Sequence, residues 1–164
     1  MVIRTADIDD IDTLAAIIRT AYSDVAERFG LNAENCPKHP SNYTDQRVRN
    51  DLDRGVVYYA LEKDRDICGC AALEKAGSQL CYLERLSILP RYRRKGLGSQ
   101  LVRHIFKESN ALGASNVGIG IIARQHELKQ WYIRLGFVEG ETKSFDHLPF
   151  DVTFLLYSLR DQEL

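Results

Sequence analysis

The chain has 164 residues, of which 45% are hydrophobic and 27% are charged, and its formal net charge at pH 7 is −1. This length is sufficient for one domain with a hydrophobic core, and the composition argues against intrinsic disorder. A net charge so close to zero gives no global field toward nucleic acid or a membrane surface, so we expect neither as a partner.

The sequence also indicates the cellular compartment. No apolar run approaches the roughly 20 residues that a helix needs to cross a bilayer. The first ten residues, MVIRTADIDD, become acidic at once and lack the apolar core of a signal peptide, so we expect a cytoplasmic protein. The four cysteines contain no C-x-x-C pair. Reduced, buried cysteines are therefore favoured over a zinc site built from Cys36, Cys68, Cys70 and His39, and no metal is expected.

The first third of the chain predicts a strand followed by two helices. The strand is expected at 2–4, and apolar residues then recur at helical spacing from 8 to 25. Aspartates can cap the start of this helix, and Gly30 ends it. The segment 31–42 holds two prolines and no periodicity, which predicts a loop before a second helix at about 44–54.

Three strands and a helix are predicted in the middle of the chain. The runs 56–61, 67–73 and 80–88 are separated by short polar turns, which is typical of an antiparallel meander. A helix is expected from 98 to about 110, with Gly113 at its end.

The last third predicts a strand, a helix and two more strands. The run 117–123 is nearly all apolar, as expected for a strand covered on both faces. A helix follows at about 126–135, and 137–159 predicts two strands around a turn near 146–149.

The predicted element order is therefore β-α-α-β-β-β-α-β-α-β-β. It indicates an α/β (α+β) fold with a mixed central sheet of about seven strands. The helix between strands four and five makes a crossover, which places these two strands parallel. Because no linker or repeat interrupts the pattern, we expect a single domain over residues 1–164.

The segment from Leu83 to Ser99, LERLSILPRYRRKGLGS, has the features of a phosphate-binding loop. A strand ends at Pro90, a cationic turn follows, and two glycines open a helix. The first helical N–H groups are unpaired, the helix dipole favours negative charge, and glycine permits close approach of the backbone. The alternative is a solvated basic turn before a helix.

Two motifs, with a strand between them, resemble those of the GNAT acetyltransferase superfamily. Residues 93–98 read RRKGLG, which resembles the family pattern Arg/Gln-x-x-Gly-x-Gly/Ala, and Pro90 precedes it as is usual there. Residues 132–137 read YIRLGF, which is similar to the family ending Tyr-x-x-x-Gly-Phe. The opening VIRTADIDDIDTLAAI also resembles the first strand and helix of the family.

The resemblance implies acetyl-CoA as co-substrate and a primary amine as acceptor. It implies that N–H groups of 94–99 receive the pyrophosphate and that the pantetheine arm pairs with the fourth strand, where this strand and the fifth splay apart. The Ile88 N–H is then the candidate donor to the thioester oxygen. His126 stands where the family often has asparagine, and it is expected to contact the cofactor or to serve as an alternative base. The residues expected at the cofactor are Leu86, Ser87, Ile88, Arg93, Arg94, Lys95, Gly96, Leu97, Gly98, Ser99 and His126.

Acetyl transfer to an amine also needs a base and an acid. Glu84 is the candidate base, because it lies in an otherwise apolar strand where desolvation raises the pKa of a carboxyl group. Alternation places it on the face of Tyr82 and Leu86 unless a bulge intervenes. Tyr132 occupies the position of the family's usual general acid. The alternatives are a salt-bridged Glu84 and a Tyr132 that belongs to the core.

The sequence leaves the acceptor open, whether a small molecule or a peptide or protein amine. In the family, the acceptor is shaped by segments that correspond here to 29–43 and 144–150. Their side chains (His39, Tyr43, Phe145, His147 and Phe150) predict an aromatic, weakly polar pocket, and Asp146 or Glu27 could attract a cationic amine.

The function predicted is an N-acetyltransferase that acts by direct attack in a ternary complex. The alternative is an acyl-CoA-binding regulatory or interaction module without turnover. Nucleic-acid binding through 91–95 is a weaker third hypothesis. The family's habit of dimerising makes a homodimer an expectation.

Overall fold

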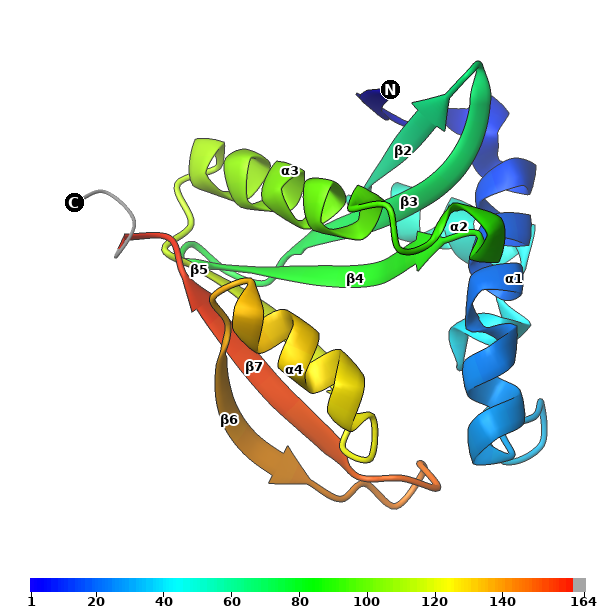
Figure 1. The fold of residues 1–164 in the computed structure, drawn as a ribbon, viewed down its shortest axis with the longest axis vertical. Coiled ribbons are helices and arrows are strands. Elements are labelled where there is room, and N and C mark those ends of the chain that lie inside the picture. Colours follow the sequence, from blue (N-terminus) through cyan, green and yellow to red (C-terminus); the bar gives the residue numbers. More distant parts are fainter. Residues whose placement is uncertain (161–164) are drawn as a thin grey trace. The chain divides into compact units, whose positions relative to one another are not determined.

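The computed structural model describes residues 1–160, so the last four residues of the predicted 1–164 domain lie outside the described residues. Seven strands form one sheet in the order β1-β2-β3-β4-β5-β7-β6 (Figure 1). The predicted element order and the mixed seven-stranded sheet are confirmed.

The strands are β1 (Val2–Thr5), β2 (Val57–Lys63), β3 (Asp66–Lys75), β4 (Leu80–Ile88), β5 (Asn116–Ile122), β6 (Val138–Lys143) and β7 (Val152–Ser158). The helices are α1 (Ile11–Phe29), α2 (Asp45–Asp53), α3 (Leu97–Ala111) and α4 (His126–Arg134). Three short 3-10 helices, η1 (Ile8–Asp10), η2 (Pro40–Asn42) and η3 (Pro90–Tyr92), were not predicted.

The described chain divides into two compact units. The first holds Met1–Glu74 and Leu83–Ile105, and the second holds Lys75–Tyr82 and the chain from Phe106 onward. The chain passes between the units inside regular elements, because β4 begins in the second unit and ends in the first, while α3 runs the other way.

The core of the first unit forms between the helices α1 and α2 and the strands β2 and β3. Asp7 caps η1 with its side chain, and Gly30 ends α1 in the left-handed conformation, at a φ of 64°. The apolar stripe of α1 is buried, as its spacing predicts. The cluster consists of Ala6, Ile11, Leu14, Ala15, Ile17, Ile18, Tyr43, Val48, Val56, Tyr58, Ala60, Cys70 and Ala72.

The strand pairing in the first unit follows the predicted polar turn. Asp64 and Arg65 both have positive φ, 54° and 72°, which suits a two-residue turn between Lys63 and Asp66. This hairpin makes β2 and β3 antiparallel, and β1 pairs antiparallel with β2 on the other side.

In the second unit, β4 and β5 are parallel, as predicted, over three residue pairs from Leu80↔Asn116 to Tyr82↔Gly118. β7 then inserts between β5 and β6 and pairs antiparallel with both, which the chain order did not reveal (Figure 1). Phe106 stacks on Tyr157 with 3.7 Å between ring centroids. Gly136 has a φ of 110°, and a Cβ there would lie 2.8 Å from the Tyr157 ring, so this position requires glycine.

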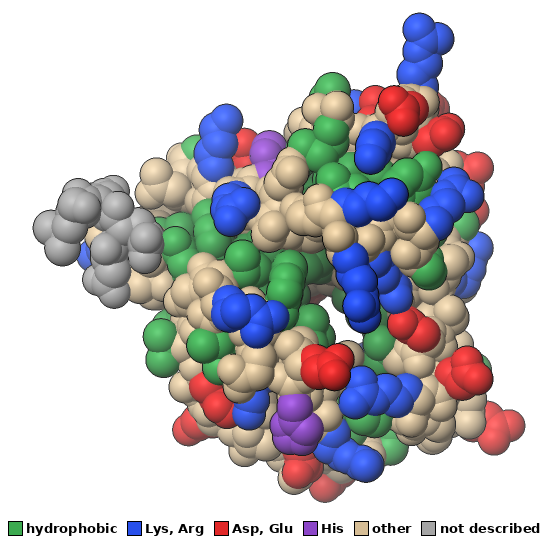
Figure 2. Space-filling model, viewed as in Figure 1, with side chains coloured by type: hydrophobic (Ala, Val, Ile, Leu, Met, Phe, Trp, Pro, Cys, Tyr) green, Lys and Arg blue, Asp and Glu red, His purple; other side chains and the backbone are tan. Residues whose placement is uncertain are grey.

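The surface carries charges of both signs. Figure 2 shows Lys and Arg side chains interspersed with Asp and Glu over the face drawn, which fits the net charge of −1. All four cysteines are buried as free thiols. Within residues 1–160, no helix combines the length and the apolar character that a membrane crossing demands.

Candidate active site

The glycine loop joins η3 to α3 and exposes the start of that helix. Arg94 and Gly96 adopt positive φ values of 62° and 78°, which turn the backbone into Leu97. The Gln100 N–H bonds back to the Gly96 carbonyl at 3.3 Å, and the Ser99 hydroxyl donates to the same oxygen at 2.9 Å. The N–H groups of 97–99 precede this first bond and have no acceptor within the helix. The loop therefore has the local form of an anion-binding helix start.

The Arg93 side chain ties this loop to the rest of the first unit. Its guanidinium donates to the Ile88 carbonyl (3.1 Å), to the Ala21 carbonyl (2.7 Å) and to the Asp24 carboxylate (2.9 Å). These bonds hold the end of β4 against α1. Its side chain thus has three partners within the protein, and the charge that Arg93 is expected to add at the pyrophosphate stays a prediction.

The other cations of the loop are more exposed. Arg91 and Lys95 both lie near the ring of Tyr92, at 5.0 Å and 5.9 Å from its centroid. The Arg94 side chain is exposed, and it forms no ion pair or hydrogen bond with the part of the chain that the structure describes. Arg94 is thus the loop arginine whose side chain remains available to an anion.

The second half of β4 departs from regular strand geometry. Arg85 has a φ of 51°, so the alternation that would place Glu84 and Leu86 on one face is interrupted between them. After this point the Leu86 carbonyl accepts a hydrogen bond from the Tyr22 hydroxyl at 3.1 Å, and Ser87 is buried. Among the described residues, β4 pairs with β5 only from Leu80 to Tyr82.

Gly69 on β3 packs directly against the predicted thioester-binding residues. A Cβ at Gly69 would lie 2.7 Å from the Ser87 carbonyl oxygen and 2.6 Å from the Ile88 side chain. Since a backbone atom cannot yield cheaply, Gly69→Ala should displace this part of β4 and lower the free energy of unfolding by roughly 1–3 kcal/mol. Denaturant unfolding measures the loss of stability, and acetyl-CoA titration measures how the displacement of β4 changes cofactor binding.

Gly120→Ala provides the control for this prediction. Gly120 is the exposed residue of the otherwise largely buried β5, and the atoms nearest to its added Cβ are side-chain carbons at 3.2 Å or more, which can move. Equal losses in the two variants would contradict the role assigned to the close contact at Gly69.

Glu84 has the raised pKa that its sequence environment predicts. Its side chain is 31% exposed and pairs with the Arg85 guanidinium. Burial raises the pKa of Glu84 and the Glu74 carboxylate raises it further, whereas the charge of Arg85 lowers it, and the net direction is upward. The two alternatives drawn from the sequence, a desolvated carboxylate and a salt bridge, therefore occur together.

Asp51 is a buried carboxylate that the sequence analysis missed. It is 5% exposed and accepts hydrogen bonds from the hydroxyls of Tyr43 and, at 2.6 Å, Tyr58. Arg54 donates to its other oxygen at 3.0 Å, and the Arg85 Nε lies 3.7 Å away. The one signal in the sequence was Arg85 itself, a cation in an apolar strand that needs a buried counter-charge.

Tyr132 and His126 belong to the second unit. The Tyr132 side chain lies in an aromatic group, with ring centroids 4.9 Å from Trp131 and 5.3 Å from Phe137. Tyr132 is 6% exposed, as the core alternative expects, and its role as the general acid stays a prediction. His126 is exposed at the first turn of α4.

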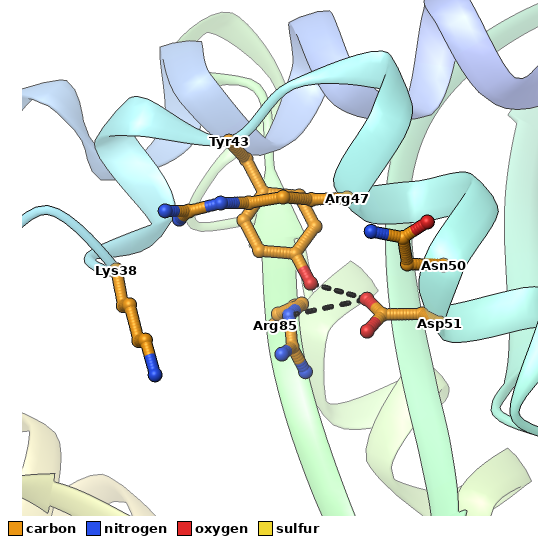
Figure 3. Close-up of a pocket in the computed structure, with 6 residues that line it drawn as sticks. All are labelled: Lys38, Tyr43, Arg47, Asn50, Asp51 and Arg85. Atoms are coloured by element: carbon orange, nitrogen blue, oxygen red, sulfur yellow. Dashed lines mark hydrogen bonds and ion pairs between the residues drawn. The ribbon is translucent and has the colours of Figure 1, made fainter.

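The residues predicted to shape the acceptor pocket are divided between the two units. Tyr43 lines a pocket in the first unit, together with Lys38, Arg47, Asn50, Asp51 and Arg85 (Figure 3). His39 is buried and its Nδ1 lies 2.7 Å from the Ser41 hydroxyl. Phe145 and His147 contact each other in the second unit, and Glu27 and Asp146 are exposed. The pocket that Tyr43 lines carries three cationic side chains, Lys38, Arg47 and Arg85, and the aromatic acceptor pocket expected from the sequence stays a prediction.

Comparison with known proteins identifies the family. Residues 54–139, just over half of the chain, match the profile of the acetyltransferase (GNAT) domain. The amino-acid acetyltransferase of Pseudomonas syringae pv. syringae is 31% identical over 106 residues, which cover 63% of this chain but only 23% of that protein. The uncharacterized N-acetyltransferase YjgM of Escherichia coli (strain K12) is 24% identical over 139 residues, covering 83% of this chain and 81% of that one.

Solved structures agree in fold. The PaiA N-acetyltransferase of Thermoplasma acidophilum, solved in complex with coenzyme A, superposes with a TM-score of 0.76 at 18% identity, covering 93% of this chain and 96% of that one. The seven-stranded order, the glycine loop at the start of α3 and the matching profile lead to one conclusion: the chain belongs to the GNAT family of acetyltransferases.

Proposed function

We propose that this protein is an acetyl-CoA-dependent N-acetyltransferase that transfers the acetyl group to a primary amine in a ternary complex. The observation that carries the proposal is Glu84, a half-buried carboxylate with a raised pKa on the strand that leads into the glycine loop. A carboxylate with its pKa raised toward neutrality is a more effective general base than an ordinary exposed one.

In this proposal the glycine loop binds the pyrophosphate of acetyl-CoA. The N–H groups from Arg94 to Ser99 supply hydrogen bonds, and the free Arg94 side chain adds charge. Leu86, Ser87 and Ile88 pair with the pantetheine arm. The Tyr22 and Arg93 side chains support the role of this segment by fixing the carbonyls of Leu86 and Ile88.

The chemical step then requires the removal of two protons from the nitrogen and the delivery of one proton to the thiolate. Glu84 takes a proton from the ammonium, directly or through a water, and the neutral nitrogen attacks the thioester carbon. The C–N bond forms as the carbonyl π electrons move to the oxygen, which the Ile88 N–H stabilises. Collapse of this intermediate breaks the C–S bond, and the departing thiolate takes a proton from Tyr132. The nitrogen loses its second proton in the same collapse, and that proton, passed through water, restores the Tyr132 hydroxyl.

We further propose that residues 1–164 act as one acetyltransferase domain. The passage of β4 and α3 through both compact units supports this, because neither unit keeps all of its strands and helices without the other. The four free, buried cysteines fit a reducing compartment, and we place the protein in the cytoplasm on that basis.

Free-thiol release from acetyl-CoA, followed with a panel of amines and peptides, tests the proposal. Turnover with at least one acceptor is expected, and Tyr132→Phe, which keeps the ring and its packing, should lower kcat by about tenfold or more. Tight acetyl-CoA binding with thermal stabilisation but without thiol release from any acceptor would instead indicate a binding module.

A further inference from the structure

The cationic pocket of the first unit has the size of a small-molecule site. Its volume is about 350 Å³, at the lower end of the range for ligand pockets. Three segments contribute to it: the connection between α1 and α2, which provides Lys38 and Tyr43, helix α2, and strand β4. The lining residues are Lys38, Tyr43, Arg47, Asn50, Asp51 and Arg85 (Figure 3).

The one carboxylate in this lining is already neutralised from within the protein. Figure 3 shows the Tyr43 hydroxyl and the Arg85 guanidinium directed at Asp51. Tyr58 and Arg54 bind the same carboxylate at 2.6 Å and 3.0 Å. Asp51 therefore holds the wall of the pocket together and is not available to attract an ammonium group.

Two of the three cations of the lining, Lys38 and Arg47, form no ion pair with the described residues. The Arg85 side chain is 18% exposed and pairs with Asp51 and Glu84, while its buried Nε makes no hydrogen bond within the described chain. Arg47 donates to the Pro37 carbonyl at 2.8 Å and lies over the Tyr43 ring, which fixes its position. Lys38 is exposed and has no side-chain partner within residues 1–160. The pocket is thus suited to an anion.

Arg85 also connects the pocket to the candidate base. Its guanidinium lies 4.9 Å from the centroid of the Tyr43 ring on one side and pairs with the Glu84 carboxylate on the other. An anionic group that contacts Arg85 in this pocket would therefore be held beside the residue that pairs with Glu84.

Building on the function proposed above, we propose that the acceptor is a small-molecule primary amine that also carries a carboxylate. Lys38, Arg47 and Arg85 bind the carboxylate, and the amine is thereby presented to Glu84. Guanidinium groups favour this partner because their paired N–H donors match the two oxygens of a carboxylate.

Matched acceptors provide the first test. Each ω-amino acid of three to six carbons is compared with the n-alkylamine of the same length, so that amine basicity stays similar while the carboxylate is present or absent. We expect kcat/KM to be at least about tenfold higher for the amino acids, the factor that one charge-assisted hydrogen bond supplies. Equal values for the two series would overturn the inference and leave the acetyltransferase function intact.

Variants of the lining residues test whether the preference for carboxylated acceptors arises in this pocket. Lys38→Gln and Arg47→Gln should each raise the KM for a carboxylated acceptor by about tenfold, and the KM for the alkylamine of the same length by much less. Arg49→Gln is the matched control, because Arg49 is exposed on the same helix but does not line the pocket. A preference for acidic peptides over free amino acids would overturn the small-molecule assignment.

A binding measurement separates this inference from the proposed function. Glutarate, a dicarboxylate without an amine, should bind the wild-type protein saturably in calorimetric titration, and Lys38→Gln and Arg47→Gln should weaken this binding about tenfold. Glutarate binding without thiol release from any acceptor would overturn the acetyltransferase function and support the anion site. Absence of glutarate binding, together with turnover of alkylamines, would overturn the anion site and support the acetyltransferase function.

Discussion

Replacing Glu84 with glutamine is expected to lower kcat/KM for acetyl transfer by about 10²- to 10⁴-fold, the range for loss of a general base. The amide has nearly the same shape but cannot accept the proton that the ammonium must lose. Because burial raises the pKa of Glu84, its negative charge destabilises the folded state. The free energy of unfolding of the variant at neutral pH should therefore be at least as large as that of the wild type. Thiol release and thermal unfolding together separate a catalytic defect from a folding defect.

The raised pKa of Glu84 also predicts the shape of the pH profile. The base acts only when deprotonated, so activity should fall as the pH decreases through this pKa, which lies above the ordinary value of about 4.3. Glu74→Gln removes a neighbouring carboxylate that raises the pKa of Glu84, and should therefore move this acidic limb to lower pH.

Two outcomes would contradict the assignment of Glu84 as the base. One is an acidic limb that stays in place in Glu74→Gln, because a limb set by the amine itself would behave in this way. The other is a loss of activity in Glu141→Gln as large as that in Glu84→Gln. Glu141 lies on exposed β6 and pairs only with Lys143 among the described residues, so its replacement should change little.

Asp51→Asn should lower the free energy of unfolding by roughly 2–4 kcal/mol. The substitution removes the counter-charge of Arg85 and Arg54 at a position that is 5% exposed. It also weakens the acceptor for the Tyr43 hydroxyl, which stays protonated because burial raises the pKa of Tyr43 to about 12. Urea unfolding at neutral pH measures the loss.

This stabilisation should depend on pH in a defined direction. Burial alone raises the pKa of Asp51, but hydrogen bonds from Tyr43 and Tyr58, with the charge of Arg85, outweigh it and hold the pKa below its usual range. The contribution of Asp51 is therefore complete above the unfolded value of about 3.9 and is lost as the pH falls through the folded pKa. The difference between wild type and Asp51→Asn should shrink on acidification.

Asp53→Asn is the control on the same helix. Asp53 is exposed at the last residue of α2, where a negative charge opposes the helix dipole, so its removal should change the stability by no more than about 0.5 kcal/mol. A loss in Asp51→Asn no greater than in this control would show that the Asp51 network contributes little.

Local patterns in the sequence determined the elements of this fold. The strand at Leu80–Ile88 and the helix that begins at His126 lie where alternation, periodicity and glycine placement predict them. The parallel pairing of β4 and β5 followed from the helix between them, and the anion-binding form of the glycine loop from the residues at the start of α3. Each of these features depends on residues close together in the chain.

Only the tertiary structure decided the features that depend on distant segments. The place of β7 between β5 and β6 rests on pairing energies that chain order does not encode. The hydrogen bonds of Arg93 to Asp24 and Ala21 span 69 and 72 positions of the chain, so no local pattern predicts them. The positive φ of Arg85 and its approach to Asp51 could not be read from strand alternation, which assumes a regular backbone. These long-range contacts pair Asp51 within the protein and so decide which charges the pocket of the first unit presents. The sequence alone therefore determined the family and its co-substrate, whereas the surroundings of Asp51 and Arg85 depend on contacts between distant segments.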